Sequence, residues 1–97
     1  MRMIRIVLIC GGVPEAEGRQ AAIDIADEFN RDRSPRYVNA SCRFESGKLI
    51  LSCDNDGWDA EGRNLMDEFS DCLSAYVATP FGGDLRLDSA IDLSRRP

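Results

Sequence analysis

Apolar residues are concentrated in the first ten positions, and the chain then changes abruptly to a pair of glycines. The stretch 3–10 is rich in Ile and Val, which favour strands, and the glycine pair interrupts it. Pro14 follows, where the missing N–H of proline costs nothing in the first turn of a helix, and two glutamates nearby suit the positive end of the helix dipole. The pattern predicts a strand at 3–10 and a helix at 14–31.

Apolar and polar residues alternate along the segment 36–45, which predicts a strand with one buried face. The residues expected to point inward are Val38, Ala40, Cys42 and Phe44. Tyr37 has the opposite parity, so we expect it to be an outward ring on this strand.

A two-residue turn at Ser46-Gly47 joins this strand to a second one at 48–54. The turn pairs Glu45 with Lys48, and the apolar residues of both strands then fall on the same face. The sequence therefore predicts a hairpin with a defined register.

Helical periodicity returns at 58–77, after a break rich in Asp, Asn and Gly. Asp56 or Asp59 is a candidate N-cap, and Trp58 either covers the end of the core or stands out as a binding anchor. A last strand is predicted at 84–92, followed by a tail at 93–97. Its expected inward residues are Leu85, Leu87, Ser89 and Ile91.

The predicted order, strand-helix-strand-strand-helix-strand, resembles the ferredoxin-like topology. This resemblance implies an α+β fold in which a four-stranded antiparallel sheet has the spatial order 4-1-3-2. Right-handed crossovers place both helices on one face of the sheet and leave the other face open. We expect residues 1–97 to form a single domain.

Composition excludes several classes of function. The 97 residues carry a formal net charge of -5, which argues against direct binding of nucleic acid or of an anionic membrane. The chain has no histidine, so Ser-His-Asp and Cys-His mechanisms are excluded. The N-terminal apolar run is too short for an export signal, so we expect a cytoplasmic protein whose four cysteines are reduced.

The cysteines have spacings too wide for a zinc knuckle, and strand and helix parity point all of them inward. We therefore expect buried thiols, no metal and no cofactor. Cys10 is a candidate exception, because a thiol beside the start of a helix can have a lowered pKa.

Charges separate onto two predicted faces. The outer surface of the two helices is expected to bind a partner, through the acidic residues Asp24, Asp27, Glu28, Asp67, Glu68 and Asp71. The open face of the sheet combines an apolar centre with a basic rim, as protein interfaces do. We expect it to form a homodimer through Arg5, Val7, Ile9, Arg43, Ile50 and Arg86.

These features favour a small non-enzymatic module that docks its acidic face on a basic protein surface, as a phage-encoded inhibitor of a nucleic-acid-binding protein would. Two alternatives remain open. One is a domain that senses a small molecule at the loops formed by Gly11, Gly12, Val13, Gly82 and Gly83. The other is an enzyme that uses carboxylates or Cys10.

Overall fold

The computed structural model describes residues 2–31, 36–77 and 84–94. Its elements are β1 (Ile4–Gly11), α1 (Glu15–Arg31), β2 (Val38–Glu45), β3 (Lys48–Asn55), α2 (Arg63–Tyr76) and β4 (Asp84–Asp92). The strands and helices follow one another in the predicted order.

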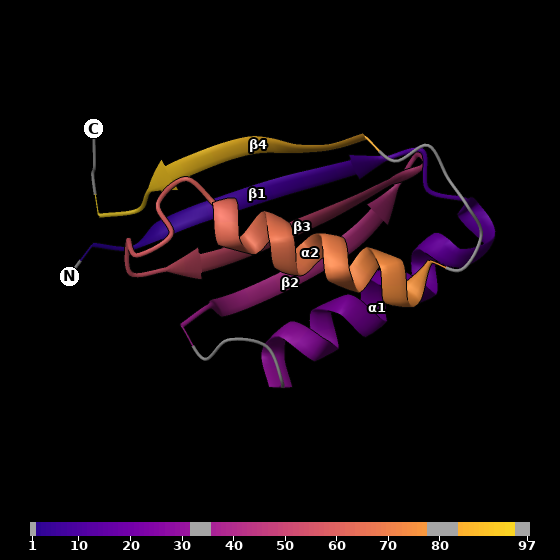
Figure 1. Cartoon of the computed structure of the whole chain (residues 1–97), viewed down its shortest axis with the longest axis horizontal. Helices are drawn as coiled ribbons and strands as arrows, with labels where there is room; N and C mark the ends of the chain where they lie inside the picture. Colours follow the sequence, from indigo (N-terminus) through magenta and orange to yellow (C-terminus); the bar gives the residue numbers. More distant parts are fainter. Residues whose placement is uncertain (1, 32–35, 78–83, 95–97) are drawn as a thin grey trace.

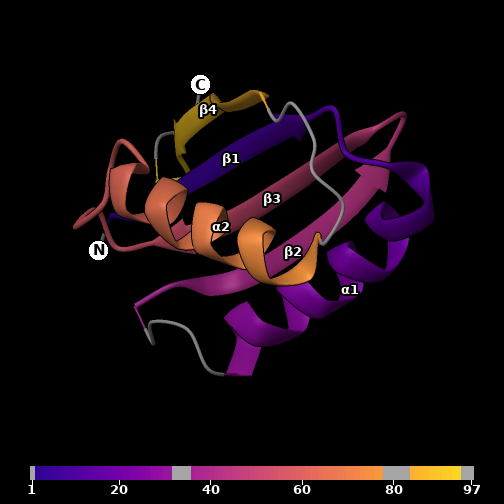
Figure 2. The same cartoon turned by 45° about the vertical axis from the view of Figure 1, so that its right-hand side comes forward.

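The four strands form one sheet in the order β2-β3-β1-β4, and all neighbouring strands are antiparallel (Figure 1). This is the predicted order read from the opposite edge, so the α+β architecture is confirmed. Both helices lie on the same face of the sheet, with α1 beside β2 and α2 across the middle strands (Figure 2).

The hairpin of β2 and β3 has the predicted register, with Glu45 opposite Lys48 and Phe44 opposite Leu49. Ser46 and Gly47 have φ angles of 50° and 77°. Two consecutive positive φ angles give the type I′ turn, whose twist matches that of antiparallel strands. The turn chemistry therefore explains why the register could be predicted from the sequence.

The core lies between the sheet and the helices. Its most deeply buried residues have 0 % exposure and come from the two middle strands and both helices: Ile6, Leu8, Leu49, Leu51, Cys53, Ile25, Leu65, Phe69 and Cys72. Full burial of a large aliphatic or aromatic side chain contributes about 1.5–3 kcal/mol, so this layer is the main source of stability.

Two glycines allow close contact between the layers. A Cβ atom on Gly18 of α1 would lie 2.2 Å from the ring of Phe44 in β2. Gly62 precedes α2 with a φ of 72°, and a Cβ there would lie 2.6 Å from Cγ2 of Ile6. Larger residues at either position would push a helix away from the sheet.

Helix α2 begins at Arg63, and the prediction that it starts at residue 58 was wrong. The Asn55 side chain holds the preceding segment in a turn, because its Oδ1 accepts hydrogen bonds from the N–H groups of Gly57 and Asp59. Asp59 caps the helix as expected, although it lies four residues before Arg63. Its carboxylate accepts hydrogen bonds from the backbone N–H groups of Asn64 and Leu65.

An irregularity in β2 reverses the predicted parity at its start. The register shifts between Val38 and Ser41, and Asn39 has a left-handed φ of 56°. The prediction that Tyr37 points outward was wrong, because it is buried at 4 % exposure. The prediction that Val38 points inward was also wrong: it is 43 % exposed and pairs with Asp54. An inserted residue exchanges the two faces of a strand.

A second irregularity has the same effect in β4, where the register against β1 shifts between Val7 and Leu8. Ser89 and Ile91 were wrongly predicted to point inward: they pair with Val7 and Arg5 on the open face, and Ile91 is 52 % exposed. Leu87 keeps the predicted side, opposite Leu8, but it is 42 % exposed because the helices cover β4 only slightly.

Candidate functional site

The helical layer carries an excess of negative charge. Helix α1 has five acidic residues and two arginines, and α2 has three acidic residues and one arginine. The arginines contact nearby carboxylates: Arg19 pairs with Glu15 at 3.9 Å, Arg31 with Asp27, and Arg63 with Glu61 at 3.3 Å. The surplus acidic residues therefore determine the electrostatic potential of this side.

The six acidic residues predicted to form a docking face occupy two different environments. Asp27, Asp67 and Asp71 are exposed on the outer surface of the helices. Asp24 is half-buried and accepts a hydrogen bond from Nε2 of Gln20 at 3.0 Å. These four residues lie where a partner could approach.

The other two predicted residues, Glu28 and Glu68, are half-buried like Asp24, but the Glu28 carboxylate bonds to α2 and one Glu68 oxygen is buried, so their placement on the outer surface was wrong. Glu28 lies between the helices, where it accepts hydrogen bonds from the Tyr76 hydroxyl at 2.6 Å and the Cys72 thiol at 3.4 Å. The hydrogen bond to Glu28, followed by burial, raises the pKa of Tyr76 to about 12. The Oε2 atom of Glu68 is buried. Both glutamates therefore belong to the packing of the helices.

The open face of the sheet brings together all six residues predicted for a dimer. Three rows of side chains cross this face from β2 to β4, following the strand registers. The first row is Val38, Asp54, Arg5 and Ile91; the second is Ser41, Ser52, Val7 and Ser89; the third is Arg43, Ile50, Ile9 and Arg86. Val7, Ile9 and Ile50 form an apolar patch on the two middle strands, as predicted, but the middle row also contains three serines.

The rim of this face is not a set of isolated positive charges, and this corrects the sequence interpretation. Arg43 pairs with Glu45, and Arg86 pairs with Asp84 at 3.4 Å, in each case on the same strand. Ion pairs on an exposed rim have little net charge, so this face does not attract a polyanion strongly.

Asp54 is the residue of this face that the sequence analysis missed. It is 1 % exposed and accepts two hydrogen bonds from Arg5, at 2.8 and 3.0 Å, and one from Asn39 at 2.9 Å. Burial raises the pKa of Asp54, but the hydrogen bonds from Arg5 and Asn39 and the charge of Arg5 outweigh this, and the pKa lies below its usual value. In the alternation of β3, Asp54 falls on the same side as Ile50 and Ser52, and this feature of the sequence could have placed it on the open face.

The loop after β1 was the alternative ligand site. Gly11 is half-buried and Gly12 is exposed with a φ of 74°, whereas Val13 is buried and donates its N–H to the carbonyl of Gly47 at 2.9 Å. Gly82 and Gly83 lie outside the described residues. The Val13 amide is therefore engaged within the fold.

The four thiols are free, and Cys10, Cys53 and Cys72 are buried while Cys42 is half-buried. Burial, assisted by the charge of Asp84, raises the pKa of Cys10, so the lowered pKa considered from the sequence was wrong. Burial also raises the pKa values of Cys42 and Cys53 to about 12. Across the described ranges, no group of three or more acidic or cysteine side chains is arranged to hold a metal ion.

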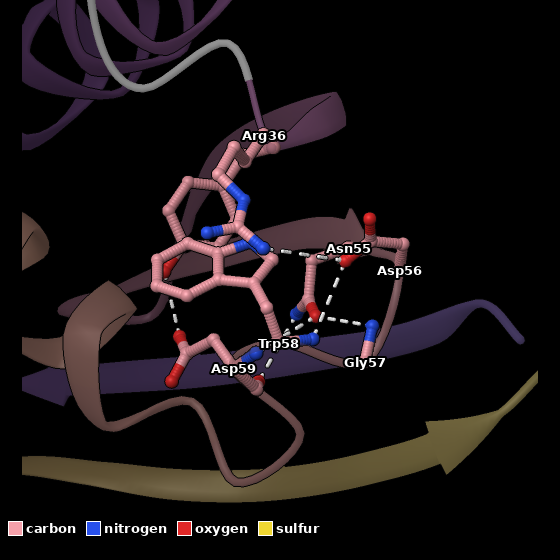
Figure 3. Close-up of polar contacts among 7 residues, drawn as sticks. Arg36, Asn55, Asp56, Gly57, Trp58 and Asp59 are labelled. Carbon is pink, nitrogen blue, oxygen red and sulfur yellow. Dashed lines mark hydrogen bonds and ion pairs between the residues drawn. The ribbon is translucent and has the colours of Figure 1, made fainter.

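Figure 3 shows a cluster around Trp58 that no sequence pattern predicted. The guanidinium carbon of Arg36 lies 4.2 Å from the centroid of the Trp58 ring, and the Tyr37 ring centroid lies 5.3 Å from it. Arg36 also pairs with Asp56 at 3.9 Å. Trp58 is half-buried and packs against the core, so it covers the core end. Arg36 and Trp58 come from separate segments, and sequence spacing does not reveal their contact.

Comparison of the chain with protein-family models, with curated proteins and with solved structures finds no match. Among the described residues, no helix is long and apolar enough to span a membrane. The function is therefore inferred from the surfaces of the molecule.

Proposed function

We propose that this chain is a small cytoplasmic, non-enzymatic module of ferredoxin-like fold that docks the outer surface of its two helices on a basic protein surface. The observation that carries the proposal is the excess of acidic residues on the helical layer, with Asp27, Asp67 and Asp71 exposed. Charge complementarity of this kind accelerates encounter and selects partners. Four free thiols agree with a reducing compartment.

The partner that fits this surface is a protein with a patch of Arg and Lys residues, such as the nucleic-acid-binding surface of another protein. An acidic face that occupies such a patch competes with nucleic acid for it, which makes the module an inhibitor. The loop after β1 and Cys10 support the alternative functions less well, because the Val13 amide is engaged and burial raises the pKa of the Cys10 thiol.

The test compares two variants with the same change in net charge. Asp67→Lys/Asp71→Lys alters the exposed face of α2, whereas Glu61→Lys/Asp88→Lys alters exposed acidic residues before α2 and on β4. Proteins from the native host are captured on the immobilised chain and challenged with duplex DNA. We expect wild type and the second variant to capture the same basic protein, and the DNA to displace it.

Asp67→Lys/Asp71→Lys should weaken binding of that protein by about tenfold or more, and added salt should weaken binding to the wild type because exposed charges are screened. Circular dichroism verifies that both variants are folded. Equal binding by the two variants, or binding that salt does not change, would contradict the proposal.

A further inference from the structure

We propose that the open face of the sheet binds a second copy of this chain, with a two-fold axis that runs along the strands between β1 and β3. This contact lies on the side of the sheet opposite the helices, so it leaves the acidic face available. It adds to the proposed function and does not depend on it.

The arrangement of the rows on the open face supports this axis. A two-fold axis between β1 and β3 places β1 of one copy over β3 of the second copy, and β2 of one copy over β4 of the second. Each residue therefore faces the residue that occupies the mirrored position in the same row of the second copy. Ile9 then faces the second copy's Ile50, and Arg5 faces the second copy's Asp54. The apolar residues of one copy then meet those of the other, and the Arg5 side chain, which is 45 % exposed above the buried Asp54 carboxylate, is covered by the contact.

The two strand irregularities extend this match to the edges of the sheet. Each turns an apolar residue onto the open face, Val38 on β2 and Ile91 on β4, and both lie in the row of Arg5 and Asp54. They are 43 % and 52 % exposed in the single chain. The axis places Val38 opposite the second copy's Ile91, so both lose contact with water when two copies meet.

Charge distinguishes this face from the helical face. Two copies that met through their helices would bring the exposed Asp27, Asp67 and Asp71 of one copy against the same three residues of the other. Like charges across an interface oppose association. The rim of the sheet face consists instead of the pairs Arg43–Glu45 and Arg86–Asp84. The balanced face is therefore the one suited to self-association.

The size of the face determines how tightly it can bind. Four strands spaced about 4.8 Å apart and about eight residues long present roughly 500 Å² per copy. The total of roughly 1,000 Å² is at the lower limit for a specific interface, so we expect a dissociation constant on the order of micromolar.

Sedimentation equilibrium of the full chain tests the proposal across concentrations around that value. Ile50→Lys changes the centre of the face, and we expect it to weaken the dimer about a hundredfold. Ile91→Lys changes the edge and should weaken it about tenfold. Ile23→Lys is the matched control, because Ile23 is 62 % exposed on α1, and it should leave the dissociation constant within about twofold. A wild type that stays monomeric up to about 1 mM, or equal losses in Ile23→Lys and Ile50→Lys, would overturn the proposal.

A cross-linking experiment tests the same contact independently if a lysine variant fails to fold. Val7 of one copy faces Ser52 of the other across the axis, and stacked sheets lie about 10 Å apart. A short bismaleimide should therefore join the Val7→Cys and Ser52→Cys proteins when they are mixed. It should not join Ile23→Cys to Ser52→Cys. Absence of the first product contradicts the proposed axis. Asp67→Lys/Asp71→Lys should remain dimeric, which separates this contact from the proposed docking face.

Discussion

The hydroxyl of Tyr37 donates a hydrogen bond to Oδ2 of Asp59 at 2.6 Å, and both residues are buried. The same carboxylate accepts the backbone N–H groups of Asn64 and Leu65 at 3.1 and 3.0 Å. The side chain of Asn64 in turn donates to the Tyr37 hydroxyl at 3.0 Å. This network joins the start of β2 to the start of α2, two segments that are distant in sequence.

We predict that Asp59→Ala lowers the free energy of unfolding by about 3 kcal/mol, because it leaves three buried donors without their acceptor. Tyr37→Phe should cost about 1 kcal/mol, since the ring packing is retained. Urea unfolding, followed by the fluorescence of Trp58, measures both. Asp56→Ala is the control, because Asp56 is exposed, and it should cost under about 1 kcal/mol. A cost for Asp59→Ala no larger than that of the control would show that the network does not stabilise the fold.

Acid should weaken the protein partly through Asp54. Its pKa in the folded protein lies below the usual value, so the unfolded chain binds a proton more readily. The stabilisation from the pair with Arg5 is then fully present above the unfolded pKa of about 3.9 and is lost as the pH falls through the lower, folded pKa. We predict that the difference in unfolding free energy between wild type and Asp54→Asn narrows as the pH is lowered from neutral. A difference that stays constant as the pH falls would contradict the prediction.

The thiols should react slowly in the folded protein. At pH 8, a pKa of about 12 leaves roughly a thousandfold less thiolate than the ordinary value for cysteine. We predict that Cys42 and Cys53, and to a smaller extent Cys10, resist iodoacetamide until urea unfolds the chain. Peptide mass spectrometry locates the label. Ser70→Cys provides an exposed thiol as the positive control. Rapid labelling of native Cys10 would restore it as a candidate nucleophile.

Gly62→Ala should destabilise the protein by about 2 kcal/mol. The residue has a left-handed φ of 72°, and the added Cβ would lie 2.6 Å from Cγ2 of Ile6. Gly11→Ala is the matched control, because the nearest atom to its added Cβ is 4.0 Å away and belongs to a side chain. The control should change stability by less than about 1 kcal/mol. Thermal and urea unfolding measure both, and equal effects would show that the contact with Ile6 is unimportant.

Local patterns were sufficient to predict the order of the elements and the hairpin register. The turn at Ser46 and Gly47 determines which residues of β2 and β3 face each other, since both adopt positive φ angles. The apolar spacing likewise identified the buried faces of β1 and β3 and of the two helices. These features depend on neighbours within a few residues, which is why periodicity reveals them.

Only the tertiary structure decided which way Tyr37, Val38 and Ile91 point. A residue inserted into a strand reverses which side chains point to each face of the sheet. Such an irregularity is favoured by contacts with other segments, as when the Tyr37 hydroxyl bonds to Asp59. The pairing of Arg5 with Asp54 likewise depends on β1 lying beside β3. The sequence by itself determined the elements and the total charge. Long-range packing determined the composition of the two faces, because strand pairing brings distant residues together that no local pattern connects.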